Sequence, residues 1–436
     1  MTPRTRPVAM PDAPAVRHDE ASHDDAHGAP IRAVSMDPIL VLAALSLACL
    51  GLVMVYSASA WLAKQTTGSW TYYLYRQAVF LSAGIATMLV VSRINYRWLR
   101  RYAVHGMLGS LALLLLVLFI GREVNGAKRW LALGPLTMQP SEVAKIALII
   151  FLSFTLARKG TRVKNFKEGF MPAMLAAGTT MALVTLEKDL GTTILLGMIS
   201  LTMLYVAGTR ASYVFGAILL ALPVVWYQVV GVAFRNTRLM EFRAGGGYQV
   251  KQGLIAVGSG GFWGTGLGGG RHKLGHLPEN HTDFILATVG EELGLVGILV
   301  VLALFLTITW RGLLIARRAA DPFGTYLAVG LSTMFGLQAL VNVSVIFNVI
   351  PAKGITLPLV SYGGSSLLIS LAAIGMLLSV SRSNETWRSF SEPATTRGTR
   401  GTRGTRRRRR DPRDVRPNVR AAPVASHGAA LTSDAP

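Results

Sequence analysis

The sequence predicts an all-α, polytopic membrane protein with about ten transmembrane helices. Its 436 residues are 51% hydrophobic and 15% charged, and the mean hydropathy is +0.43. That is too apolar for an ordinary water-soluble protein. A helix needs roughly 20 residues to cross about 30 Å of hydrocarbon, and lipid cannot satisfy exposed backbone groups, so long apolar runs form helices. The expected spans are 38–61, 77–93, 103–120, 143–157, 171–186, 191–208, 211–231, 284–310, 324–349 and 365–381.

The two ends of the chain differ in composition from the membrane domain, which we expect at 38–385. Residues 1–37 are rich in Pro, Ala, His and Asp. They predict a disordered head rather than a signal peptide, which would need an early apolar core. Residues 386–436 predict a disordered basic tail that includes five consecutive arginines. This tail could bind anionic membrane lipids or serve only for solubility. The single cysteine, Cys49, excludes an internal disulfide and multi-thiolate zinc sites.

Basic residues beside the spans predict the orientation. Those at 93–101, 158–167 and 311–318 fall on the same side as both termini, which we therefore expect to be cytoplasmic. Basic residues kept on the opposite face suggest an anionic substrate there. The net charge of +22 favours anionic lipid or phosphate over nucleic acid, and no nucleic-acid partner is expected. The outer basic residues are Arg122, Lys128, Arg129, Arg235, Arg238, Arg243, Lys251, Arg271, Lys273 and Lys353.

The longest loop, 232–283, is too long to be a mere connector. Its glycine-rich stretches at 244–253 and 258–270 would let the backbone fold tightly or approach a ligand closely. Gly264, Gly266 and Gly269 spell G-x-G-x-x-G, but no βαβ unit surrounds them, so a dinucleotide site is not expected.

Asp283 stands where this polar loop enters the eighth span. A carboxylate so placed could act as a base toward a hydroxyl, or it could simply cap the helix. His272, His276 and His281 precede it, yet their spacing fits no standard zinc motif.

Three further charged groups lie in or beside the spans. Glu142 and Lys145 share one helical face, which predicts an internal ion pair. A second group, Glu291 and Glu292, lies about two turns into the eighth span, where both a proton relay and structural pairing remain open. Lys353 stands among prolines and glycines, and could hold a phosphate or anchor the chain at the interface.

Four motifs together resemble the SEDS family (shape, elongation, division and sporulation). They are GAKRWLALGPLTMQPSEVAK at 126–145, DLGT at 189–192, LPENHTDFI at 277–285 with GEELG at 290–294, and KGITLPLVSYGGSS at 353–366. Residues 52–59 and 134–139 are more similar to the division member of the family than to the elongation member. Where the family commonly reads Gln-Pro-Asp-Leu-Gly, this chain reads Glu-Lys-Asp-Leu-Gly at 187–191.

The resemblance implies a peptidoglycan glycosyltransferase that polymerises lipid II on the outer face of the bacterial cytoplasmic membrane, at the division septum, and releases undecaprenyl diphosphate. The family's essential aspartate falls on Asp283, and its functional lysine falls on Lys353. We expect the substrate-binding residues to be Lys353, Arg129, Trp130, Glu142, Lys145, Glu279, His281 and Ser361.

The chemistry needs a base for the attacking 4-hydroxyl and help for a diphosphate leaving group. Asp283 could be the base, while Lys353 and Arg129, with or without a divalent cation (Mg or Mn) whose ligands are unknown, could stabilise the leaving group. Inversion from an α-linked donor to a β-linked product needs one displacement, so no enzyme nucleophile is required.

The resemblance also implies partners: a class B penicillin-binding protein acting as septal transpeptidase, and other divisome proteins. Three other functions remain open, namely a flippase for lipid II, an elongation-type polymerase and a noncatalytic division scaffold. The charged cluster on one face favours a polymerase over a flippase, which needs a path to both faces.

Overall fold

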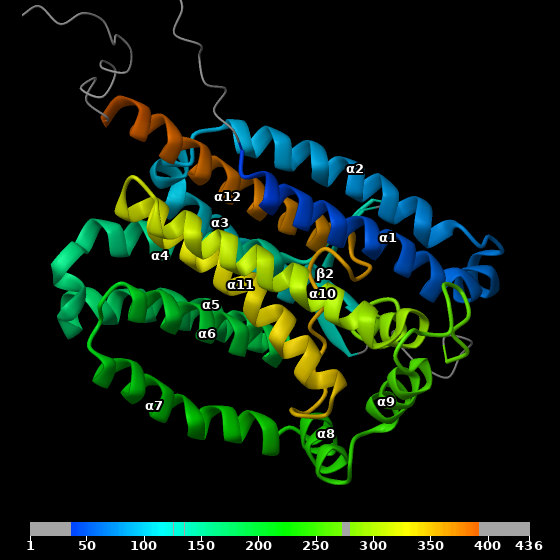
Figure 1. Cartoon of the computed structure of the whole chain (residues 1–436). Helices are drawn as coiled ribbons and strands as arrows, with labels where there is room; N and C mark the ends of the chain where they lie inside the picture. The colour runs from blue at the N-terminus through cyan, green and yellow to red at the C-terminus, as the bar shows by residue number, and fades with distance from the viewer. Residues whose placement is uncertain (1–35, 125, 135, 273–279, 392–436) are drawn as a thin grey trace, which may run out of the picture. The chain divides into compact units, whose positions relative to one another are not determined.

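The computed structural model describes residues 36–124, 126–134, 136–272 and 280–391 (Figure 1). The predicted head up to residue 35, and the predicted tail from residue 392 onward, lie outside the described residues. Within the described part, nine helices are long and apolar enough to cross a membrane. They are α1 (Pro38–Thr67), α2 (Tyr72–Arg93), α3 (Arg97–Ile120), α4 (Pro140–Lys159), α5 (Met171–Leu186), α7 (Ala211–Val230), α10 (Ile285–Arg317), α11 (Pro322–Ile346) and α12 (Gly364–Ser391).

The sixth predicted span corresponds to α6 (Leu190–Val206), an apolar helix of 17 residues. Every predicted span therefore overlaps a helix, and the predicted fold class is confirmed. Helices far apart in the sequence pack together, for example α2 with α12 and α4 with α11 (Figure 1). The centre of the bundle is apolar, with Leu148, Leu152, Phe335 and Leu377 fully buried. None of the residues of α7, all of which the structure describes, is buried.

Helix starts at one end of the bundle are fixed by carboxylates that also join neighbouring helices. Asp37 caps α1 by accepting from the Leu40 amide at 3.1 Å, and Pro38 suits the first helical position because its missing N–H needs no partner. The same carboxylate accepts from Arg311 Nη2 of α10 at 2.6 Å. Asp321 caps α11 and accepts from Arg97 Nε of α3 at 2.9 Å. We call this end the basic end, because it carries the loops at 93–101, 158–167 and 311–318.

The opposite end, which we call the site end, contains a small sheet that the all-α prediction did not include. Strands β1 (Arg122–Val124), β2 (Ala127–Leu133) and β3 (Leu136–Met138) pair antiparallel in the order β1-β2-β3. Gly126 and Gly134 adopt positive φ angles of 73° and 64° in the two connections, where glycine is favoured. Hydropathy spans of about 20 residues cannot detect strands this short.

The long loop at the site end contains two helices, which the glycine content did not predict. It forms α8 (Ala233–Arg243) and α9 (Tyr248–Gly260), followed by a glycine segment at 261–272. This segment lies against α10, which has a break at Gly294 with φ 69°. A side chain at Gly264 would meet the Glu292 carbonyl oxygen at 2.2 Å, so glycine is required for this approach. The glycines thus serve backbone packing against α10.

The same glycine segment accounts for the two buried glutamates of α10. Glu291 accepts hydrogen bonds from the Arg271 amide at 2.6 Å and contacts His272 Nδ1 at 3.0 Å. Glu292 accepts from Ser57 Oγ of α1 at 2.6 Å and from the Gly268 amide at 3.0 Å. Of the two roles left open by the sequence, the structure therefore supports structural pairing.

Candidate functional site

The backbone that carries Asp283 is tied to the loop between α11 and α12. Asn342 of α11 donates from Nδ2 to the carbonyl oxygens of Asp283 and Ile355, at 2.9 Å each. Ser361 donates from Oγ to the Thr282 carbonyl at 2.6 Å and accepts from the Leu357 amide at 2.8 Å. These bonds fix the start of α10 against the segment that contains Lys353.

The Asp283 carboxylate points toward that segment rather than capping the helix. A side chain at Gly354 would lie 3.0 Å from Asp283 Oδ2, so the absence of one leaves the carboxylate directly beside the backbone after Lys353. The N-cap residue of α10 is Phe284, which makes no side-chain capping bond. Asp283 is therefore not the N-cap residue of α10, which was the alternative role considered for it.

Arg238 is the basic residue that the structure shows within electrostatic range of Asp283, and Lys353 lies nearby in the chain next to Gly354. Arg238 of α8 donates from Nη1 to the Ala352 carbonyl at 3.2 Å. Burial lowers the pKa of Arg238, and the nearby charge of Asp283 partly opposes that shift. For Lys353, burial and then the positive charge of Arg235 lower the pKa to about 8, while Asp189 acts in the opposite sense. Lys353 therefore lies within electrostatic range of two further charged residues.

Arg129 joins the sheet to the turn between α5 and α6. It lies on β2 and donates from Nε to the Glu187 carbonyl at 3.0 Å and from Nη2 to the Lys188 carbonyl at 2.7 Å. Lys188 in turn donates from Nζ to the Gly126 carbonyl at 2.7 Å. Lys188 adopts a φ of 64°, which is unusual for a residue with a side chain. The paired contacts hold the turn in this conformation.

The turn also presents two acidic side chains. Asp189 caps α6, accepting from the Thr192 amide at 3.0 Å and its hydroxyl at 2.8 Å. Glu187 is 1% exposed, and neither of its carboxyl oxygens has a hydrogen-bond partner among the described residues. Burial, and then the nearby Asp189, raise the pKa of Glu187 to about 8, although Arg129 opposes the shift. At neutral pH this carboxyl is mainly protonated.

The structure brings together only some of the predicted site residues. Asp283, Lys353 and Arg129 belong to one electrostatic cluster with Arg235 and Arg238. Such an arrangement can bind an anion beside a carboxylate that is able to accept a proton.

Two other predicted site residues form the expected ion pair inside α4. Lys145 Nζ lies 2.8 Å from Glu142 Oε1, and both residues are buried. Their pairing is therefore confirmed, whereas their predicted contact with substrate stays a prediction. Trp130 is half-buried on β2 next to Arg129.

Two further predicted residues, His281 and Ser361, lie on the segments that adjoin the Asp283 backbone. The His281 ring packs near Tyr73 and Tyr362, with centroids 5.3 and 5.7 Å away. The Ser361 hydroxyl is already hydrogen-bonded to the Thr282 carbonyl and the Leu357 amide, so contact with a substrate would compete with those bonds. Glu279 and His276 lie outside the described residues.

The sequence predicts no site role for Asn342 or Glu187. Asn342 is a polar residue in an apolar span, a signal that can mark function in a membrane protein. Arg235 and Arg238 are predicted only as members of the outer basic group that could stabilise an anionic leaving group, with no role of their own. Glu187 was visible as a departure from the family motif, but its burial depends on the turn that Arg129 holds.

A metal site is not evident in the described part of the chain. No three His, Cys, Asp or Glu side chains there form a group that could hold a metal ion. The charged group that the structure shows near Asp283 is the basic Arg238. No step proposed below passes through a metal.

The fold and site define a multi-pass membrane protein that holds a carboxylate among basic groups at one end of its helices. The chain belongs to the FtsW/RodA/SpoVE family of cell cycle proteins, whose sequence profile matches residues 38–386. This match confirms the resemblance to the SEDS family.

Curated relatives and solved structures agree with this assignment. The chain is 44% identical to "Probable peptidoglycan glycosyltransferase FtsW" of Geobacter metallireducens, over 79% of this chain and 94% of the relative. It is 38% identical to the protein of the same name from Idiomarina loihiensis, over 79% and 86%.

Two solved structures share the fold. One is a chain of "Structural coordination of polymerization and crosslinking by a peptidoglycan synthase complex", with a TM-score of 0.67 and 28% identity. The other is the rod shape determining protein RodA of Thermus thermophilus, with a TM-score of 0.62 and 28% identity. In both cases the alignment covers 80% of this chain and 98% of the other.

Proposed function

We infer that this chain is a peptidoglycan glycosyltransferase that polymerises lipid II during septal wall synthesis in cell division. The names of its relatives support the activity, and their designation as FtsW supports the division role over elongation. The observation that carries the chemical part is the placement of the Asp283 carboxylate beside Gly354, within electrostatic range of Arg238.

In the proposed reaction, the 4-hydroxyl oxygen of the acceptor sugar attacks the anomeric carbon of the donor. The new C–O bond forms as the bond from that carbon to the diphosphate oxygen breaks, and undecaprenyl diphosphate leaves with the bonding electrons. Asp283 accepts the hydroxyl proton. A single displacement inverts the anomeric centre, so the chain need not form a covalent intermediate.

The basic residues stabilise the charge that develops on the leaving group. Lys353, Arg238 and Arg129 come from three different elements, so together they can surround a diphosphate. A lysine with a pKa near 8 is mostly charged at neutral pH, and a bound anion would increase that fraction. We assign substrate-binding roles to these residues and positioning roles to Asn342 and Ser361.

The buried carboxylates inside the bundle favour this function over transport. A flippase needs ionisable groups along a path to both faces. Glu142, Glu291 and Glu292 are each engaged in an ion pair or hydrogen bonds, which suits a structural role.

The proposed location is the bacterial cytoplasmic membrane at the septum, with the site end outside and both termini in the cytoplasm. A class B penicillin-binding protein is the proposed partner. In support, one structural neighbour comes from a peptidoglycan synthase complex that joins polymerisation to crosslinking. Other divisome proteins and anionic lipids bound by the basic tail remain further proposed partners.

The test is polymerisation of labelled lipid II by the purified chain, with its cognate transpeptidase present, comparing Asp283→Asn with the parent. Loss of a general base predicts a decrease of roughly 10²- to 10⁴-fold. Glu123→Gln is the matched control, because this exposed residue lies on β1 at the same end of the bundle. Polymerisation by Asp283→Asn at the parent rate would refute the role of Asp283, and an inactive parent complex would refute the function itself.

A further inference from the structure

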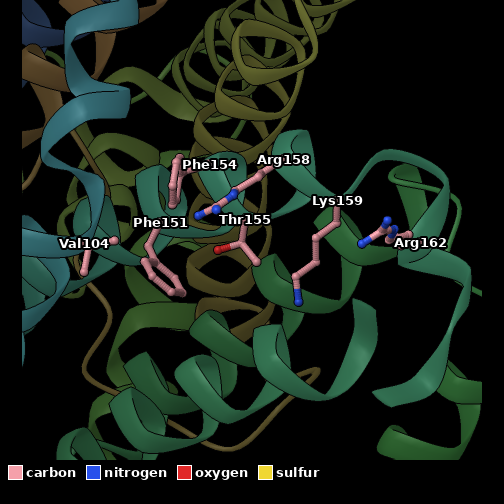
Figure 2. A pocket seen from close by; sticks show the side chains of 7 residues that line it. All are labelled: Val104, Phe151, Phe154, Thr155, Arg158, Lys159 and Arg162. Atoms are coloured by element: carbon pink, nitrogen blue, oxygen red, sulfur yellow. The ribbon is translucent and has the colours of Figure 1, made fainter. Parts of the chain in front are cut away.

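A hollow at the basic end of the bundle has the chemistry of a lipid-binding site. It has a volume of about 660 Å³ and lies where α3, α4 and the turn after α4 meet (Figure 2). This volume is within the range of small-molecule sites in proteins. It is far along α4 from Glu142 and Lys145, and it plays no part in the reaction proposed above. The lining residues are Val104, Phe151, Phe154, Thr155, Arg158, Lys159 and Arg162.

One part of this hollow is strongly basic. Arg158 and Lys159 end α4, and Arg162 follows in the 3-10 turn η1 (Gly160–Lys164). Among the described residues, neither Arg158 nor Lys159 has a carboxylate within ion-pair distance. Arg162 lies 4.0 Å from Glu168, but both side chains are well exposed, at 76% and 59%, so this contact is weak. Lys159 donates from Nζ to the Glu168 carbonyl, so Arg158 and Arg162 are the two basic groups of the hollow that can bind an anion.

The other part of the hollow is apolar. In Figure 2 the lining runs from Val104 and Phe151 on the left to Lys159 and Arg162 on the right. Val104 and Phe151 belong to membrane-spanning helices, and Val104 is 42% exposed. In the view of Figure 2 the charged end of Arg158 points back toward Phe154, so a basic group lies beside the apolar lining.

We propose that this hollow binds an anionic phospholipid, with the head-group phosphate on Arg158 and Arg162 and an acyl chain along Phe151 and Val104. Guanidinium groups bind phosphate oxygens in bidentate fashion, and basic pockets between helices at the cytoplasmic face suit anionic head groups. The sequence predicts that this end faces the cytoplasm. A free phosphate ion would contact only the basic residues of the hollow. The apolar lining therefore favours a phospholipid over free phosphate as the ligand.

The experiment uses the full-length chain in mild detergent and counts bound lipid by native mass spectrometry. The probes are a dioctanoyl phosphatidylglycerol, the phosphatidylcholine of equal chain length, and inorganic phosphate. We expect one phosphatidylglycerol to bind more tightly than phosphatidylcholine. Arg158→Gln/Arg162→Gln should weaken that binding roughly tenfold or more, since it removes charge-assisted hydrogen bonds.

A matched control separates this site from binding elsewhere on the basic chain. Arg317→Gln/Arg318→Gln also removes two exposed charges at the end of α10 and leaves the hollow intact. The proposal expects binding as in the parent for this control, and weaker binding for Phe151→Ala. Equal losses in both double variants, or equal binding of the two phospholipids, would overturn it. Displacement of the lipid by millimolar phosphate with no effect of Phe151→Ala would identify a simple anion site instead.

Discussion

Glu187 offers a test of the site electrostatics through stability alone. Its carboxyl is buried with no hydrogen-bond partner in the part of the chain that the structure describes, and its pKa is raised from 4.5 to about 8. An acid whose pKa is higher in the folded than in the unfolded chain favours folding at low pH. That contribution is complete below pH 4.5 and is lost as the pH rises to about 8.

The size of the effect follows from the pKa difference. Each pKa unit corresponds to about 1.4 kcal/mol of folding free energy. Relative to low pH, the raised pKa of Glu187 should therefore lower the stability of the chain by about 3 kcal/mol at pH 7, and by nearer 5 kcal/mol above pH 8. Glu187→Gln has nearly the same shape and carries no charge at any pH. The variant should therefore gain stability over the parent progressively between pH 5 and pH 8.

The measurement is thermal unfolding of the detergent-solubilised protein, followed by tryptophan fluorescence at several pH values. The informative quantity is the difference in Tm between variant and parent, because it cancels the titration of all other groups. Glu123→Gln provides the control, since it makes the same chemical change at an exposed position and leaves the buried Glu187 carboxyl in place. A Glu187→Gln difference that stays constant from pH 5 to pH 8 would refute the reasoning.

Two further predictions concern Lys353 and the ion pair between Glu142 and Lys145. Because the pKa of Lys353 is lowered to about 8, its positive charge is lost as the pH rises through that value, so kcat/KM for lipid II should fall above pH 8. Lys353→Arg should shift that decline to higher pH, and an unchanged profile would contradict the role of Lys353. Glu142→Gln leaves Lys145 buried without its counter-ion and should cost roughly 3–5 kcal/mol, measured as a lower Tm. Glu142→Gln/Lys145→Met should recover most of this loss, and failure to do so would mean that the pair is held for another reason.

The sequence could predict the helices because membrane insertion depends on a local property. A run of apolar residues is sufficient for a span, and every predicted span overlaps a helix. The ion pair of Glu142 and Lys145 was predictable for the same reason, because both residues lie on one helix. Strands β1 to β3 and helices α8 and α9 were missed, since each is shorter than a membrane span and depends on its neighbours.

The site depends on contacts that no local pattern contains. Asn342 reaches Asp283 across 59 residues, and Arg238 reaches Ala352 across 114. The sequence motifs that contain Asp283 and Lys353 could be assigned to one site only because they resemble motifs of the SEDS family. The turn with Lys188 at positive φ, which buries Glu187, likewise requires Arg129 from a different element.

The glycine segment over α10 has a mechanical consequence. The Gly268 amide of this segment donates a hydrogen bond to Glu292, and the Arg271 amide donates one to Glu291. These amides take the place of water, which the bilayer does not supply to the two carboxylates. Lifting the segment away would remove these amide donors and leave Ser57 of α1 as a donor to Glu292, at a cost of several kcal/mol. The segment and the first turns of α10 should therefore move as one body, and a partner that pulls on this part of the outer loop would also pull on the helix that begins beside Asp283.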